Sequence, residues 1–88
     1  MEKPLRKEGV LLIKNIDNSI LFDQESGKVY RINNTMSEIW NLCNGKNTID
    51  SIAEQMIQKY NVPTIKIKGD ITNMLKYLKV LKLIGDSK

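Results

Sequence analysis

Three short apolar stretches, each bounded by polar residues, follow one another early in the chain. They cover residues 10–16, 19–22 and 29–32. Asp17 and Asn18 are turn residues between the first two stretches, and Gly27 stands where a left-handed turn residue is expected before the third. The pattern predicts three consecutive antiparallel strands that form a meander.

After Asn33 the apolar positions recur every three and four residues, which is the period of a helix. The predicted helices cover residues 36–43, 49–60 and 64–82. Thr35 and Glu38 have the spacing of a capping box at the first helix, and Thr48 is expected to cap the second. Pro63 separates the second helix from the third, because proline and the residue before it interrupt a helix.

The order β-β-β-α-α-α within 88 residues predicts an α+β domain in which a small sheet packs against three helices. The predicted domain covers residues 10–84. Residues 1–9 are charged, contain a proline and a glycine and show no apolar period, so we expect a flexible N-terminal arm. Residues 85–88 are expected to form a C-terminal tail.

The third predicted helix carries a continuous apolar stripe. The members of the stripe fall within about one third of the helix circumference and are Ile67, Ile71, Met74, Leu75, Leu78 and Leu81. Asp70 and Tyr77 border the stripe on one side, and Lys68, Lys79 and Lys82 border it on the other. Such a stripe must be covered by another part of the molecule.

Composition excludes several classes of function. The chain is 41% hydrophobic and 27% charged, which suits one small domain. It has one cysteine and no histidine, so an internal disulfide is excluded and the commonest metal ligand and general base are absent. We therefore expect no catalysis, no metal and no cofactor. Apolar runs are too short for a membrane span and no signal-peptide pattern opens the chain, so we expect a cytoplasmic protein.

Cys43 and Trp40 lie on the apolar face of the first predicted helix, and we interpret both as core residues. A thiol enzyme that uses Cys43 is the remaining catalytic alternative. It would need an activating base for the thiol, and the sequence offers no obvious one.

The excess of positive charge lies in the last part of the chain. Residues 1–63 hold eight basic and eight acidic side chains, and residues 64–88 hold six and two, which gives the net charge of +4. A basic helix after a short break would suit a winged DNA-binding module. However, the start of this helix offers isoleucine and lysine where arginine, asparagine or glutamine would read base edges. Nucleic-acid binding is therefore kept as the alternative function and not as the expected one.

The third strand of a meander is an edge with unpaired backbone N–H and C=O groups, so it can accept an additional strand. In this strand Tyr30 and Ile32 share one face, and Val29 and Arg31 share the other. A guest strand along residues 29–33 would meet the apolar side chains of the third helix as a pocket floor, and charged side chains of that helix would select its sequence. The alternative is an edge covered by a terminus or by a second copy of the chain.

Five motifs, in matching order and spacing, resemble those of the PqqD-like proteins, also called recognition elements for ribosomally made precursor peptides. They are Ile20-Leu21-Phe22-Asp23, residues 25–33, Glu38-Ile39-Trp40 with Gly45, residues 48–52, and Tyr60-Asn61-Val62 with Asp70-Ile71. The resemblance covers residues 10–84. Two features depart from the family pattern: Lys82 stands where many members have glycine, and the third helix is lysine-rich where many are acidic. Both departures bear on which peptide is bound.

The resemblance implies a winged helix-turn-helix-like fold without catalysis, which binds the leader segment of a precursor peptide as an added strand between the third strand and the third helix. The residues carried over to this groove are Val29, Tyr30, Arg31, Ile32, Asn33, Lys66, Ile67, Asp70, Ile71 and Met74. Strand backbone groups would supply affinity, and pockets between Ile67, Ile71 and Met74 would take apolar leader side chains. Charge preference would be set by Arg31, Lys66 and Asp70.

The resemblance also implies partner proteins. Free-standing members are similar to this chain in length and present the leader to a modifying enzyme, such as a leader peptidase, a cyclase or a radical-SAM enzyme. Lasso peptide maturation is the favoured pathway, and a radical-SAM pathway comes second. Some members form homodimers, so a homodimer is a further expectation; a membrane partner is not expected.

Overall fold

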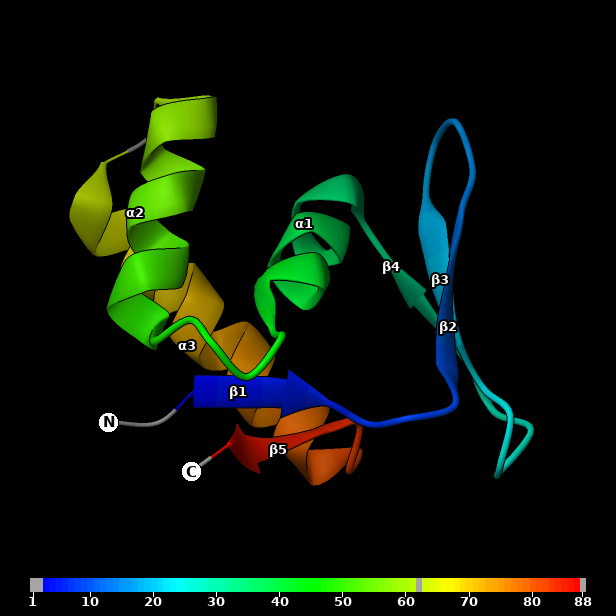
Figure 1. Cartoon of the computed structure of the whole chain (residues 1–88). Helices are drawn as coiled ribbons and strands as arrows, with labels where there is room; N and C mark the ends of the chain where they lie inside the picture. The colour runs from blue at the N-terminus through cyan, green and yellow to red at the C-terminus, as the bar shows by residue number, and fades with distance from the viewer. Residues whose placement is uncertain (1–2, 62, 88) are drawn as a thin grey trace.

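The computed structural model describes residues 3–61 and 63–87, and the elements follow the expected order with one strand added at each end (Figure 1). The strands are β1 (Lys3–Arg6), β2 (Val10–Lys14), β3 (Ser19–Asp23), β4 (Val29–Ile32) and β5 (Ile84–Ser87). The helices are α1 (Asn34–Leu42), α2 (Ile49–Tyr60) and α3 (Thr64–Val80). The predicted α+β class, with a three-stranded antiparallel sheet followed by three helices, is confirmed.

The meander β2-β3-β4 forms because each apolar stretch ends in a turn that the sequence permits. In the first turn the N–H of Asn15 donates to the carbonyl oxygen of Asn18 at 2.8 Å. In the second turn Gly27 has a φ of +76°, the left-handed conformation predicted from the sequence. The two turns place β3 between β2 and β4, and β4 lies at one edge of the sheet.

The core lies between the inner face of this sheet and the three helices. The largest fully buried side chains include Trp40, Leu21, Ile39, Ile52, Met56, Ile71 and Leu78. The core interpretation of Trp40 and Cys43 is confirmed, since the two residues are 2% and 0% exposed. Among the described residues, no helix combines the length and the apolar character that a membrane crossing requires.

The cap of α1 differs from the prediction. Asn33, and not Thr35, is the N-cap, and its side-chain oxygen accepts a hydrogen bond from the Met36 N–H at 2.8 Å. The helix therefore begins two residues earlier than predicted, and Glu38 instead binds Lys59 of α2 at 2.6 Å. Asparagine caps as well as threonine does, so the pattern held two competing start sites.

The cap of α2 is as predicted. The Thr48 hydroxyl accepts a hydrogen bond from the Ser51 N–H at 3.2 Å. The helix ends at Asn61, which adopts a left-handed φ of +51°. Asparagine tolerates this conformation better than most residues.

The expectation of a loose arm and a free tail is wrong for the described residues. β1 and β5 pair antiparallel as a second, two-stranded sheet, which is drawn in blue and red in the lower part of Figure 1. β1 is also held on its other side, where the N–H of Gly45 donates to the carbonyl oxygen of Pro4 at 2.9 Å. Residues 1 and 2 of the predicted arm, residue 88 of the tail and Val62 of the fifth motif lie outside the described residues.

The end of α3 explains why glycine would suit position 82. The N–H of Lys82 donates to the Lys79 carbonyl at 3.0 Å, and the N–H of Leu83 donates to the Leu78 carbonyl at 2.9 Å. These two bonds define a Schellman motif, whose left-handed residue is most often glycine. Here that residue is Lys82, with a φ of +59°, and the helix stops at Val80 rather than at the predicted residue 82.

Replacing Lys82 by glycine is expected to stabilise the protein. The substitution Lys82→Gly removes a left-handed strain of about 1–2 kcal/mol and adds a glycine entropy cost of about 0.5–1 kcal/mol, so the free energy of unfolding should rise by up to about 1 kcal/mol. Urea denaturation followed by circular dichroism measures the change. Lys76→Gly, in the interior of the same helix, is the matched control and should lower the free energy of unfolding by about 0.5–1 kcal/mol. Equal losses for both variants would contradict the assignment.

Candidate functional site

The free edge of β4 has a definite set of outward backbone groups. The N–H of Asp23 donates to the carbonyl oxygen of Lys28 at 2.9 Å, so this pair is hydrogen-bonded across the β3–β4 turn. In an antiparallel pair, bonded and non-bonded positions alternate. The next position, Phe22 opposite Val29, is therefore non-bonded, and so is Ile20 opposite Arg31. Val29 and Arg31 consequently direct their N–H and C=O groups away from β3.

The side chains of β4 divide as the alternation predicts. Ile32 is 3% exposed and Tyr30 is half-buried, so both face the core. Val29 is 58% exposed, and Arg31 is also exposed on the opposite face. Within residues 3–61 and 63–87, β4 pairs with β3 alone. An incoming strand would thus find backbone partners at Val29 and Arg31 and exposed side chains at the same two residues.

Val29 and Arg31 belong to a larger surface, which we call the outer sheet face. The strand registers place two rows of residues on it, and these rows are Leu11, Phe22 and Val29, and then Ile13, Ile20 and Arg31. Leu11 and Ile13 are each more than 40% exposed. Five of the six residues are apolar, so the guanidinium of Arg31 is the one charge within the two rows.

The α3 residues predicted for the groove separate into two groups. Lys66 and Asp70 are exposed. Ile67, Ile71 and Met74 are 5%, 0% and 6% exposed and belong to the hydrophobic core. The apolar stripe of α3 is therefore covered by the rest of the domain, and Ile71 presents no surface to a guest.

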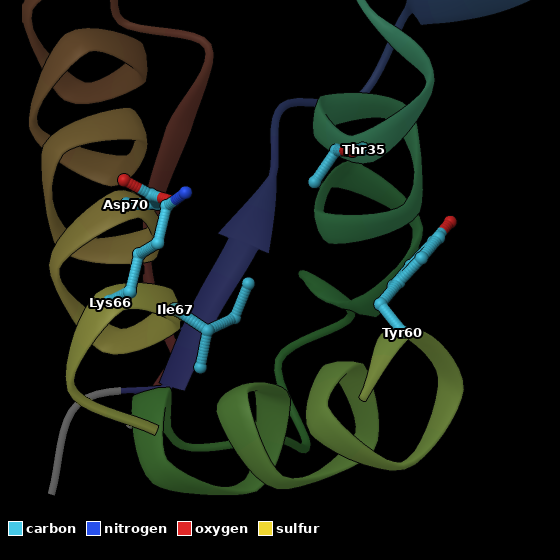
Figure 2. Close-up of a pocket in the computed structure, with 5 residues that line it drawn as sticks. All are labelled: Thr35, Tyr60, Lys66, Ile67 and Asp70. Carbon is cyan, nitrogen blue, oxygen red and sulfur yellow. The ribbon is translucent and has the colours of Figure 1, made fainter. Parts of the chain in front are cut away.

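A hollow of about 180 Å³ opens between the three helices, and we call it the helix hollow (Figure 2). Its lining residues are Thr35, Tyr60, Lys66, Ile67 and Asp70. Ile67 points from α3 into the space between the helices, and Thr35 lies across from it on α1. Ile67 gives the hollow an apolar floor, and the other lining residues carry two hydroxyls, an ammonium and a carboxylate. Three of the ten predicted site residues meet here.

A second hollow, of about 340 Å³, lies at the end of β4, and we call it the strand hollow. Its lining residues are Asn18, Arg31, Ile32, Asn33 and Met36. Three other predicted site residues meet here. Thr35 lines the helix hollow and its neighbour Met36 lines the strand hollow, so the first turn of α1 is common to both. The sequence prediction described one groove, whereas the structure divides six of its residues between two hollows that share this turn.

Four lining residues were not predicted as site residues. Asn18 was assigned to a turn, Thr35 to a helix cap, and Met36 and Tyr60 to apolar helix faces. The shift of the cap to Asn33 frees the Thr35 side chain from capping. A signal for Tyr60 was its place at the end of a helix, where one edge of the ring remains accessible; it is 39% exposed.

A buried carboxylate holds the β3–β4 turn in place. Asp23 is 4% exposed, and its Oδ1 accepts hydrogen bonds from the N–H groups of Glu25 at 3.0 Å and Ser26 at 3.4 Å. Its Oδ2 pairs with the Lys7 ammonium at 3.1 Å. Burial acts to raise the pKa of Asp23, but the Lys7 hydrogen bond and the two backbone donors outweigh it and hold the pKa below its ordinary value. The turn that sets the β4 register therefore depends on an ionised Asp23.

Cys43 does not have the properties of a catalytic thiol. It is fully buried, and its Sγ donates to the carbonyl oxygen of Ile39 at 3.2 Å. Burial raises the pKa of Cys43 to about 11, although the nearby Arg6 charge acts in the opposite direction. The thiol is therefore protonated at neutral pH and shielded from solvent.

The model of one protein family, described as coenzyme PQQ synthesis protein D (PqqD), matches residues 18–84. The chain belongs to the PqqD family. The match includes β3, β4 and all three helices, and so takes in every residue that lines the two hollows. The search of curated proteins found no match.

Two solved structures share the PqqD fold of this chain. TbiB1 in complex with the TbiA(beta) leader peptide is 19% identical, with a TM-score of 0.77 over 91% of this chain and 93% of that one. A lasso peptide synthetase B1 complexed with the leader peptide is 17% identical, with a TM-score of 0.79 over 94% of this chain and 98% of that one. At this level of identity the likeness establishes the fold.

The contribution of Asp23 to stability is expected to depend on pH. Its pKa is lower in the folded than in the unfolded state, so its stabilisation is complete above the ordinary value near 3.8 and is lost as pH falls through the folded value. The difference in unfolding free energy between wild type and Asp23→Asn should be constant above about pH 5 and shrink below it. Lys7→Met removes one partner of Asp23, so in that background the effect of Asp23→Asn on the free energy of unfolding should be smaller. A difference that does not change between pH 6 and pH 2.5 would contradict the account.

The accessibility of Cys43 can be measured directly. A thiol reagent at neutral pH should label the native protein slowly and the urea-unfolded protein at once, because the thiol is buried and protonated. Rapid labelling of the native protein would contradict the burial of Cys43 and restore the thiol-enzyme alternative.

Proposed function

We propose that this protein binds the leader segment of a ribosomally made precursor peptide as a strand added to β4. The observation that carries the proposal is the free β4 edge, where Val29 and Arg31 direct backbone groups outward beside the strand hollow. Membership of the PqqD family supports it. Further support comes from the two solved structures of the same fold, each of which is a complex with a leader peptide.

Three parts of the proposed binding surface contribute differently to leader binding. The backbone of Val29 and Arg31 supplies affinity that does not depend on sequence. The two hollows receive leader side chains, with Ile67 as the apolar floor of the helix hollow and Ile32 in the strand hollow. Arg31, Lys66 and Asp70 set the charge preference. Ile71 and Met74, which the sequence placed in the groove, keep α3 in position from within the core.

In this proposal the domain binds but does not catalyse, and it delivers the leader to a separate modifying enzyme in the cytoplasm. Lasso peptide maturation is the favoured pathway, with a leader peptidase or a cyclase as the protein partner; a radical-SAM pathway comes second. Both leader complexes of this fold support a pathway of this kind, and one of them carries the lasso name. Homodimerisation is retained as a proposal for the same protein.

The edge of β2 competes with β4 as a place for a guest strand. By the same alternation, Val10, Leu12 and Lys14 direct their backbone groups away from β3, because the Asn15–Asn18 turn pair is bonded. No residue of β2, however, lines either hollow. Both hollows contact α1, which follows β4 directly, so β4 is the better candidate.

Calorimetric titration tests binding, and amide hydrogen exchange tests its place. The titrant is the synthetic leader half of a short precursor encoded beside this gene, with the TbiA(beta) leader as a second probe and a short DNA duplex as control. Micromolar binding of the leader encoded beside this gene is expected. On binding, the N–H groups of Val29 and Arg31 should gain protection, whereas Tyr30 and Ile32, already bonded to β3, should change little.

Three results would contradict the proposal. The absence of leader binding would remove the function. Protection that appears at Leu12 and Lys14 instead of β4 would move the guest to the other edge. Salt-dependent duplex binding without leader binding would favour the nucleic-acid alternative.

A further inference from the structure

We infer that the added strand carries an acidic side chain directly across from Arg31 and an apolar side chain two residues away, across from Val29. The inference rests on the proposed function and deepens it, because it states what sequence the β4 edge selects. It follows from the register of the sheet, the exposure of two side chains and the charges around them.

The register decides which guest residues face Val29 and Arg31. Both residues have outward N–H and C=O groups, so each hydrogen-bonds the guest residue opposite it in an antiparallel guest, or the two neighbours of that residue in a parallel guest. Side chains directly opposite in such a pair lie on the same face of the sheet, with Cβ atoms about 5 Å apart. The guest residues across from Val29 and Arg31 are therefore two apart and both lie on the outer sheet face.

Arg31 forms no ion pair with an acidic side chain of the described residues. On the β3 side it stands opposite Ile20, which has no acceptor in its side chain. The ion pairs found among the described residues involve Lys7, Lys59 and Lys68, and none includes Arg31. A guest carboxylate therefore gains the most electrostatic attraction at the position across from Arg31.

Val29 favours an apolar side chain on the guest. It ends the row that begins with Leu11 and Phe22, all of them apolar. It is 58% exposed, so an apolar guest side chain beside it removes apolar surface from water at about 25 cal/mol per Å². The guest residue between the two lies on the inner face, the side of Ile32 and the strand hollow. The selected pattern is three successive guest residues: an apolar residue, an inward-facing residue and an acidic residue. Their order along the guest depends on the direction in which it pairs with β4.

A charge-reversal scan of the leader tests this pattern. Each acidic residue of the synthetic leader encoded beside this gene is replaced in turn by lysine. Each peptide is then titrated against the wild-type protein and against the Arg31→Glu and Lys28→Glu variants. One position should weaken binding to wild type about fivefold or more, because attraction becomes repulsion. The same lysine peptide should regain affinity with Arg31→Glu and not with Lys28→Glu, an exposed lysine one residue before β4.

The outcomes separate the inference from the proposed function. A leader that binds wild type but shows no position coupled to Arg31 overturns the inference and leaves leader binding standing. Coupling to Lys28 and not to Arg31 also overturns it. No binding of the unaltered leader overturns the proposed function itself. Arg31→Gln serves as a second variant whose fold is checked by circular dichroism, and with it the loss at the coupled position should fall to less than twofold.

Discussion

The alternating hydrogen bonds of β3 are the constraint on which the free β4 edge depends. Ile20 and Phe22 are bonded to β2, whereas Ser19, Leu21 and Asp23 are bonded to β4. A slip of one residue in the β3–β4 pairing would exchange the inner and outer faces of β4. The same slip would turn the outward groups of Val29 and Arg31 toward β3. The Asp23 carboxylate fixes the β3–β4 turn and is therefore coupled to the β4 edge, because that turn sets which β4 residues face β3.

The first turn of α1 connects the strand hollow to the helix hollow. Asn33 ends the strand and caps the helix, so β4 passes into α1 without a loop. This connection places Thr35 in the helix hollow and Met36 in the strand hollow. The Lys59–Glu38 pair at 2.6 Å then ties α1 to α2 beside Tyr60. Small changes in this turn would move the walls of both hollows together.

Much of the fold could be predicted from local patterns. The strands of the meander, the Thr48 cap and the five most deeply placed stripe residues of α3 follow from spacing that spans only a few residues. The pairing of β1 with β5 could not be predicted in this way, because its partners lie about eighty residues apart and Lys3–Arg6 has no apolar alternation. A proline inside β1 also argues against a strand; its carbonyl is nevertheless bonded to Gly45.

The candidate site was less predictable than the fold, for a physical reason. A periodic apolar residue such as Ile71 has the same pattern whether it lines a groove or fills the core, and only the packing of α1 and α2 against α3 decides between them. Exposed β4 residues were easier to predict, since an edge strand leaves its outward side chains free whatever packs behind it. The hollows depend on Asn18, Thr35, Met36 and Tyr60, which come from three separate segments and share no motif.

The pairing of β1 with β5 has a consequence for how this domain can be joined to other chains. Lys3 lies opposite Ser87, so a polypeptide enters and leaves the domain at nearly one point, as Figure 1 shows. That point belongs to the two-stranded sheet, whereas the β4 edge belongs to the other sheet. A host protein could therefore carry the domain as an insertion within a surface loop, or as a fusion at either end, and leave the β4 edge open. Joining Lys3 to Ser87 through a short linker and opening the chain in a surface turn would likewise leave the β4 edge in place.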